Sequence, residues 1–252
     1  GVVLAATADT VGSYTQLISG NIVTDSATDA FQITSLAGAE GSSLELQILN
    51  NNVSLAAAST FAADVNWNGI LAATVSGNTF TGAADFNQAL RFTTPSTTDL
   101  ATVAVTNNFF QFDGNSSVGV GFVSSGPALL TVDLNTFDFN GADGTGMLFT
   151  LNNEAATVTV SSNVLTDDGS GATAVEFTTI PDLSSVDLFN NLFQFNGTTG
   201  VDRGVIFSAI EAGGTITLSG NVDNVITGAT TPFFVPAGQS TGQFPVNGVL
   251  VP

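Results

Sequence analysis

The residues that could take part in chemistry are almost all carboxylates. The chain has 21 Asp and Glu residues against two cations, Arg91 and Arg203, and it contains no Lys, His or Cys. Catalytic triads of the Ser-His-Asp type, Schiff-base catalysis and thiolate metal sites are therefore excluded, because each needs a residue type that is missing. Two kinds of chemistry stay open, namely cation binding by oxygen ligands and hydrolysis by paired carboxylates.

Three turns, at residues 112–115, 139–143 and 166–171, contain the oxygen ligands that calcium prefers. None of them matches the EF-hand loop or the glycine-rich calcium repeat, and an ordinary solvated turn is the alternative for each. Calcium is the one cofactor that the sequence suggests. Its candidate ligands are Asp113, Asp143 and the adjacent pair Asp167 and Asp168.

A glycosidase that uses two carboxylates would need both of them on one face of the protein. The candidates that follow the repeated Asn residues described below are Asp113, Asp138 and Asp167. Asp138 stands between two Phe residues in an alternating strand, which predicts that it points outward. Because no other residue type supports acid-base chemistry here, we expect that the protein is not an enzyme.

The acids recur at regular places because the sequence is a repeat. Residues 131–141 read T-V-D-L-N-T-F-D-F-N-G, with apolar residues five and three positions before Asn135 and two positions after it. This pattern returns every 27–30 residues, and a second apolar pair follows about 12 and 14 positions after the Asn. The repeated Asn residues are Asn21, Asn51, Asn78, Asn108, Asn135, Asn163, Asn191 and Asn221.

A repeat of this length is typical of solenoids and propellers. Three alternating strands fit in each repeat, whereas a propeller blade needs four strands and about 40–50 residues. We therefore predict an all-β parallel β-helix of about eight coils, with the Asn residues stacked as an internal ladder at a left-handed bend. Two stacks of Phe rings are predicted: Phe80, Phe110, Phe137 and Phe193, and Phe92, Phe122, Phe149, Phe177 and Phe207.

A strand, a tight bend at an inward Asn, a second strand and a looser turn to a third resemble the right-handed parallel β-helix of the pectate-lyase-like superfamily. The resemblance extends over residues 17–235 and concerns the fold. Pectate lyases of this fold use Asp-bound calcium with a basic residue, and polygalacturonases use several Asp residues with a His. No matching Asp cluster accompanies Arg91 or Arg203, so the resemblance implies a right-handed coil and no particular activity.

The repeat defines one elongated domain, residues 17–235, between an N-terminal strand or cap (residues 1–16) and an extended C-terminal arm (residues 236–252). Neither end has an amphipathic helix as a cap, and uncapped strand edges pair with other chains. We predict a structural subunit that stacks head to tail with copies of itself. The apolar residues predicted to take part are Val2, Val3, Leu4, Phe244, Val249, Leu250 and Val251.

Two alternatives to a filament subunit stay open, namely a stalk segment of a larger adhesin and a carbohydrate-binding or glycoside-cleaving module. The second rests on fold analogy alone. The net charge of −19 excludes nucleic acid and anionic membranes as partners, and no run of 18 apolar residues predicts a membrane span. A surface rich in Thr, Ser, Asn and Gly favours an extracellular or cell-surface location, with glycans as alternative partners.

Overall fold

The computed structural model describes residues 2–6 (backbone only), 12–35, 41–152, 154–197, 200–212 and 214–251. The described residues form strands and turns without a helix, so no helix among them could cross a membrane. The strands belong to three parallel sheets and one antiparallel hairpin.

Sheets A and B each contain nine strands, and sheet C contains eight. Sheet A consists of β1 (Val2–Ala6), β4 (Phe31–Ser35), β7 (Phe61–Asn66), β10 (Gln88–Thr94), β13 (Val118–Ser124), β16 (Thr145–Leu151), β19 (Thr173–Thr179), β22 (Arg203–Phe207) and β25 (Thr231–Phe234). Sheet B consists of β2 (Ser13–Ser19), β5 (Ser43–Leu49), β8 (Ile70–Ser76), β11 (Ala101–Thr106), β14 (Ala128–Asp133), β17 (Ala156–Ser161), β20 (Ser185–Phe189), β23 (Ile216–Ser219) and β26 (Ser240–Gly242). Sheet C consists of β3 (Ile22–Ser26), β6 (Asn52–Leu55), β9 (Thr79–Gly82), β12 (Phe109–Phe112), β15 (Thr136–Phe139), β18 (Val164–Asp167), β21 (Leu192–Phe195) and β24 (Val225–Thr227).

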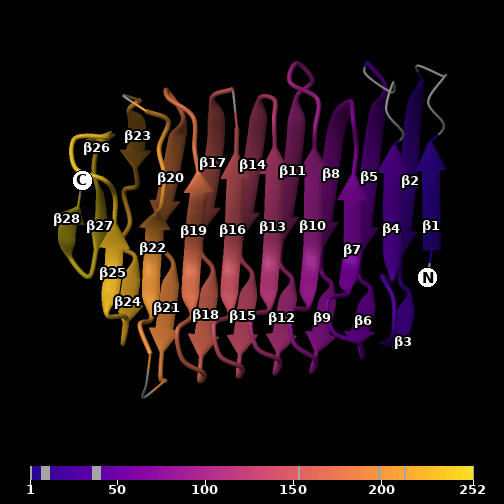
Figure 1. The fold of residues 1–252 in the computed structure, drawn as a ribbon, viewed down its shortest axis with the longest axis horizontal. Coiled ribbons are helices and arrows are strands. Elements are labelled where there is room, and N and C mark those ends of the chain that lie inside the picture. The colour runs from indigo at the N-terminus through magenta and orange to yellow at the C-terminus, as the bar shows by residue number, and fades with distance from the viewer. Residues whose placement is uncertain are drawn as a thin grey trace.

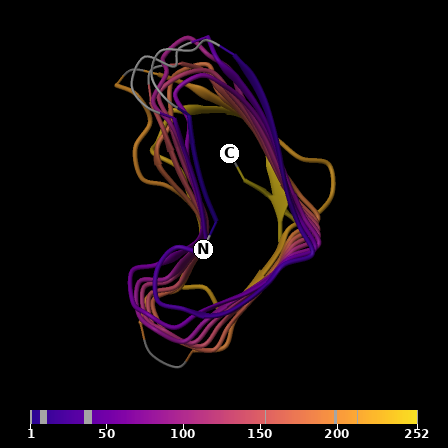
Figure 2. The same ribbon diagram turned by 90° about the vertical axis from the view of Figure 1, so that its right-hand side faces the viewer.

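Each coil runs through sheet A, then B, then C, and every strand pairs in parallel with its equivalent in the next coil (Figure 1). Viewed along the axis, the coils superimpose in one flattened outline (Figure 2). The pairing keeps equivalent residues in register, so that Val103 lies beside Leu130 and Leu130 beside Val158. This arrangement confirms the predicted parallel β-helix, because only stacking can bury the inward side of each coil.

The inward side chains form vertical stacks, as the alternating pattern predicted. The longer Phe stack in sheet A is confirmed, with ring centroids of Phe177 and Phe207 4.5 Å apart. In sheet C, Phe110 and Phe137 stack at 4.7 Å. The prediction that Phe193 extends this second stack was wrong, because Leu165 lies between Phe137 and Phe193 in the register.

The predicted Asn ladder is present, and Asn135 shows how it is held together. The Oδ1 atom of Asn135 accepts hydrogen bonds from both the backbone N–H and the Nδ2 of Asn108, each at 3.0 Å. Its own Nδ2 donates to Oδ1 of Asn163 at 3.0 Å and to the carbonyl of Val105 at 2.9 Å. These buried amides are therefore satisfied by one another, which removes the cost of burying polar groups.

Two details of the predicted ladder were wrong. The last member is Asn224, whose Oδ1 accepts from Nδ2 of Asn191 at 2.8 Å, whereas Asn221 is exposed. The final step is 33 residues long, so a count based on the usual spacing stops short of it. The left-handed backbone also belongs to the residue before the ladder Asn, as at Leu134 (φ 57°) before Asn135. The bend thus leaves the Asn side chain free to point inward.

A glycine in sheet A makes room for a Phe ring of sheet C, a feature that the repeat pattern did not indicate. A Cβ atom added to Gly119 would lie 2.6 Å from the ring of Phe137 and 2.7 Å from the carbonyl oxygen of Gly146. Both contacts are shorter than van der Waals packing allows. Glycine at this position is therefore needed for the close approach of the two sheets.

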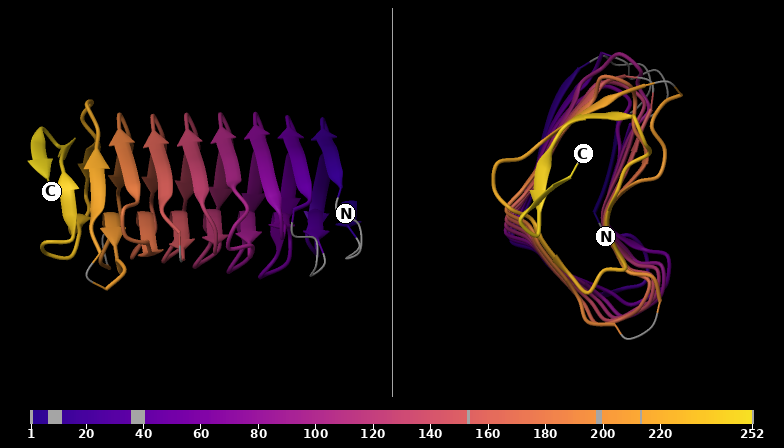
Figure 3. Two further views of the ribbon diagram at one scale, coloured as in Figure 1. Left: turned by 90° about the horizontal axis from the view of Figure 1, so that it is seen from above. Right: turned by 90° about the vertical axis from the view of Figure 1, so that its left-hand side faces the viewer.

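The two ends differ from the prediction in one respect. Residues 1–16 contain β1 and the start of β2, which pair with β4 and β5 like other members of their sheets. The predicted extended arm, however, folds back: β26 joins sheet B, and β27 (Phe244–Val246) and β28 (Val249–Val251) form a hairpin. The hairpin lies at the C-terminal end of the solenoid, and the chain terminus lies inside the outline of the coils (Figure 3). Burial of Phe244 against the open core favours this arrangement.

Candidate functional site

The outer face of sheet C carries a continuous row of polar side chains suited to binding. Equivalent residues of successive strands form a row of outward, hydrogen-bonding side chains along this face. The row consists of Ser54, Thr81, Gln111, Asp138, Thr166 and Gln194. Because parallel strands lie about 4.8 Å apart, this row presents donors and acceptors at a regular interval.

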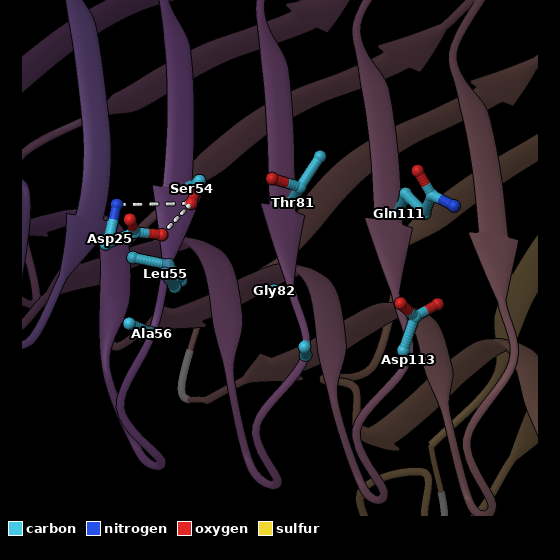
Figure 4. A pocket seen from close by; sticks show the side chains of 9 residues that line it. Asp25, Ser54, Leu55, Ala56, Thr81, Gly82, Gln111 and Asp113 are labelled. Atoms are coloured by element: carbon cyan, nitrogen blue, oxygen red, sulfur yellow. Dashed lines mark hydrogen bonds between the residues drawn. The ribbon is translucent and has the colours of Figure 1, made fainter.

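A groove of about 400 Å³ lies at the N-terminal part of this face (Figure 4). Ser54, Thr81 and Gln111 come from three neighbouring strands and contribute to its wall. Asp25 lies at one end, where its backbone N–H and carboxylate both contact the Ser54 hydroxyl, at 3.2 and 3.3 Å. Asp113 lies toward the other end. The groove can therefore accept hydrogen bonds from a hydroxyl-rich ligand and can donate others.

A second row, at the end of the sheet C strands, alternates acids with amides. Nδ2 of Asn140 donates to Asp113 at 2.7 Å, and Nδ2 of Asn196 donates to Asp168 at 2.9 Å. Asp138 lies beside this row. Partial burial raises the pKa of Asp138, and the negative charges of Asp168 and Asp113 raise it further. The face thus concentrates carboxylates without a neighbouring base.

The four predicted calcium ligands do not converge on one point. Asp113 and Asp168 are exposed and hydrogen-bonded to amides, and Asp143 is an exposed turn residue with a φ of 57°. Asp167 faces the core instead. Among the residues that the structure describes, no group of three or more His, Cys, Asp or Glu side chains is placed to hold a metal ion. Asp167 is also separated from the outward acids Asp113 and Asp138 with which it was grouped as a glycosidase candidate.

Asp167 differs from the solvated turn that the sequence suggested. Its side chain is fully buried, and neither carboxylate oxygen has a hydrogen-bond partner. In the register of sheet C it lies between Phe139 and Phe195. A signal for this position was present in the sequence, because the residue four places after the ladder Asn is Phe in the neighbouring coils.

Burial raises the pKa of Asp167 to about 7, and the nearby Asp202 carboxylate adds to the increase. The backbone amide of Gly169 lowers the pKa in part, although its geometry falls short of a hydrogen bond. Asp202 is itself buried but satisfied, since it accepts hydrogen bonds from the amides of Gly171 at 2.7 Å and Ala172 at 3.2 Å. Asp202 therefore has the backbone hydrogen-bond donors that Asp167 lacks.

The outer side of sheet A holds the one ion pair found among the described residues. Arg91 donates from Nε and Nη2 to the two oxygens of Asp64 at 2.8 and 2.6 Å. Its guanidinium also lies 3.8 Å from the ring centroid of Phe61. Arg91 is thus engaged in packing, and Arg203 is exposed at the start of β22. Asp64 was not identified from the sequence, because it lies 27 residues away from Arg91.

The residues predicted to mediate assembly lie in different environments. Phe244 belongs to the core, with its ring 5.1 Å from that of Phe233, and Val251 packs against the core. Val249 and Leu250 are 63% and 61% exposed on the outside of the hairpin. At the other end, the backbone of β1 forms the first strand of sheet A, and the side chains of its residues Val2, Val3 and Leu4 lie outside the described part of the structure.

Comparison with known proteins gives no family assignment. The chain matches no protein-family model, no curated protein and no solved structure. The fold class is a parallel β-solenoid, and its functional interpretation depends on the geometry described above.

Proposed function

We propose that the protein is a structural subunit of an extracellular or cell-surface assembly, in which solenoids stack head to tail. The observation that supports this proposal is the set of sheet edges, at both ends, that pair with no other strand among the described residues. At the N-terminal end these are β1, β2 and β3, and at the C-terminal end they are β25 and β26. Each edge presents backbone N–H and carbonyl groups that another parallel strand can pair with.

Head-to-tail stacking would continue the interior of the solenoid across the joint. Strand β25 of one copy would pair with β1 of the next, and β26 with β2, in the same parallel sense as within the chain. Large apolar side chains are exposed near both ends, including Ile22 (78% exposed) and Phe234 (47% exposed). Their burial would contribute to association. A repeated contact of this type is heterologous and produces a filament.

The charge of the chain sets a condition for this assembly. Each copy has a net charge of −19, so neighbouring copies repel one another at low ionic strength. Added salt shortens the range of the repulsion to about 10 Å at 0.1 M. Assembly should therefore increase with salt concentration, and calcium is a natural counterion for the exposed carboxylates.

We also propose that the coil is of the right-handed, pectate-lyase-like type. The Asn ladder and the order of the three sheets support this proposal.

A second candidate function is carbohydrate binding by the outer face of sheet C. The groove lined by Ser54, Thr81 and Gln111 supports it, because hydroxyl and amide groups suit a polyhydroxylated ligand. Glycan-array binding that is lost on Gln111→Ala substitution would favour this function over assembly.

The direct test is negative-stain microscopy together with sedimentation velocity, from micromolar to millimolar protein and at low and high salt. We expect rods of the width of one solenoid that lengthen with protein and salt concentration. A protein that sediments as a monomer under every one of these conditions would contradict the proposed function.

A further inference from the structure

The hairpin β27–β28 meets sheet C through contacts that a neighbouring strand would otherwise make. Strand β24 is the last strand of sheet C. The backbone N–H of Ile226 donates to Oδ1 of Asn247 at 2.8 Å, and Nδ2 of Asn247 donates back to the carbonyl of Ile226 at 2.7 Å. One amide side chain thus supplies the acceptor and the donor that the backbone of a next strand would supply.

The hairpin also terminates the Asn ladder. At the rungs described above, the backbone N–H and Nδ2 of one Asn donate to Oδ1 of the Asn in the next coil. At the last rung, the same two groups of Asn224 donate to the carbonyl oxygen of Pro245, both at 3.0 Å. This carbonyl oxygen therefore takes the place of the next Oδ1. The amide of Gly248, which donates to the carboxylate of Asp223, holds the turn of the hairpin nearby.

The N-terminal end offers the complementary group. Asn21, the first rung, uses its backbone N–H and Nδ2 as donors to Oδ1 of Asn51. No described residue donates to Oδ1 of Asn21, and no strand in the described part of the chain lies beside the outer edge of β3. A second copy placed head to tail would bring this acceptor to the two donors of Asn224.

We infer that the C-terminal hairpin is an intramolecular substitute for the next coil, and that it competes with a second copy of the chain for the end of sheet C. This inference rests on the proposed head-to-tail stacking and specifies how it is limited. Stacking on β25 and β26 alone leaves sheet C unpaired at the joint. A complete joint requires the hairpin to leave β24 and Asn224. The apparent affinity between copies is therefore the affinity of the released form multiplied by the fraction of molecules in which the hairpin is released.

The test uses the full chain with the substitution Asn247→Ala, which removes both hydrogen bonds to Ile226 and keeps the hydrophobic contacts of Phe244. The concentration at which half of the protein is assembled should fall about tenfold, the size expected for the loss of two hydrogen bonds from the competing hairpin. The matched control is Gln243→Ala, at the exposed residue just before β27, which should leave that concentration unchanged. Leu250→Ser tests the alternative expectation that the exposed apolar side of the hairpin is itself the joint. Adding Asn21→Ala to the Asn247→Ala protein should reverse the gain.

Hydrogen exchange at the Ile226 amide gives a second readout. The amide should be protected in the wild-type monomer, exchange freely in the Asn247→Ala monomer, and become protected again in rods of that variant. An Ile226 amide that stays unprotected in the rods would overturn the inference. A loss of assembly in Leu250→Ser would also overturn it, because that result would identify the hairpin as the joint itself. Wild-type rods that Asn247→Ala does not favour would overturn this inference alone, whereas the absence of rods from both proteins would overturn the proposed function as well.

Discussion

The buried carboxyl group of Asp167 should make the stability of the protein depend on pH. It is the one carboxylate in the described part of the chain that is buried with both oxygens unpartnered. The substitution Asp167→Asn keeps the shape of the side chain and removes its charge. We predict that this variant is more stable than the wild type at neutral and alkaline pH, and that the advantage disappears in acid.

The size of the effect follows from the two pKa values. The pKa of Asp167 is about 7 in the folded protein, and an Asp in an unfolded chain has a pKa of about 3.9. Below about pH 4 both states carry the proton, so the difference in pKa costs no stability. Between about pH 4 and 7 the unfolded chain releases its proton first, so the wild type loses stability as the pH rises, up to about 4 kcal/mol, and no further above pH 7.

The assay is urea unfolding of the wild type and Asp167→Asn at a series of pH values and constant ionic strength. Taking the difference between the two proteins cancels the titration of the carboxylates that they share. Asp167→Leu should give the same pH dependence with greater stability, because the site lies between Phe139 and Phe195. Asp168→Asn, at the exposed neighbouring position, is the matched control and should show no comparable change.

Two results would refute this reasoning. The first is a difference in unfolding free energy between the wild type and Asp167→Asn that stays constant across the pH range. The second is a carbon-13 titration of the Asp167 carboxyl group with a midpoint near its ordinary value, which would show that the side chain reaches water or a partner in solution.

Two further substitutions test the packing of the coils. Asn135→Ala should destabilise the protein by about 3 kcal/mol in urea unfolding. The reason is that two buried donors of Asn108 lose the acceptor they share, and each donor left without it costs about 1–3 kcal/mol. Asn140→Ala, on the exposed face, is the control and should have little effect. Gly119→Ala should cost about 1–3 kcal/mol, because the added methyl group would force the ring of Phe137 to shift. If Gly119→Ala unfolds at the wild-type urea concentration, the two sheets adjust more readily than their close packing suggests.

The interior of the solenoid was predictable to the level of single residues where the repeat is regular. The stack that includes Phe149 and Phe177 followed from counting positions, because equivalent residues in successive coils must lie beside each other once the strands pair in register. The count failed where a coil has an unusual length or residue. The regular spacing predicted Asn221 as the last rung, whereas the longer last step places Asn224 there. The adjacent pair Asp167 and Asp168 predicted a solvated turn, whereas Asp167 is buried.

The acids of the candidate site were only partly predictable for a related reason. The outward direction of Asp138 followed from strand alternation and is confirmed by its place in the outer row of sheet C. The hydrogen bond between Asp113 and Asn140 joins residues 27 positions apart, and its geometry depends on how two coils are superimposed. Similarly, no local pattern indicates that Asp202 raises the pKa of Asp167 from the next coil.

The sequence by itself determined the coil, because an apolar pattern repeated every 27–30 residues can be buried only when successive repeats stack. It also determined the Asn ladder, since those amides share one phase. Only the tertiary structure decided how the C-terminal end is closed. The same apolar residues could form a free arm or a hairpin, and the choice depends on whether Phe244 and Asn247 find partners in coils already formed, among them Phe233 and Ile226. Such contacts join the hairpin, which lies outside the repeat, to coils that belong to it, so the periodic pattern of the sequence cannot predict them.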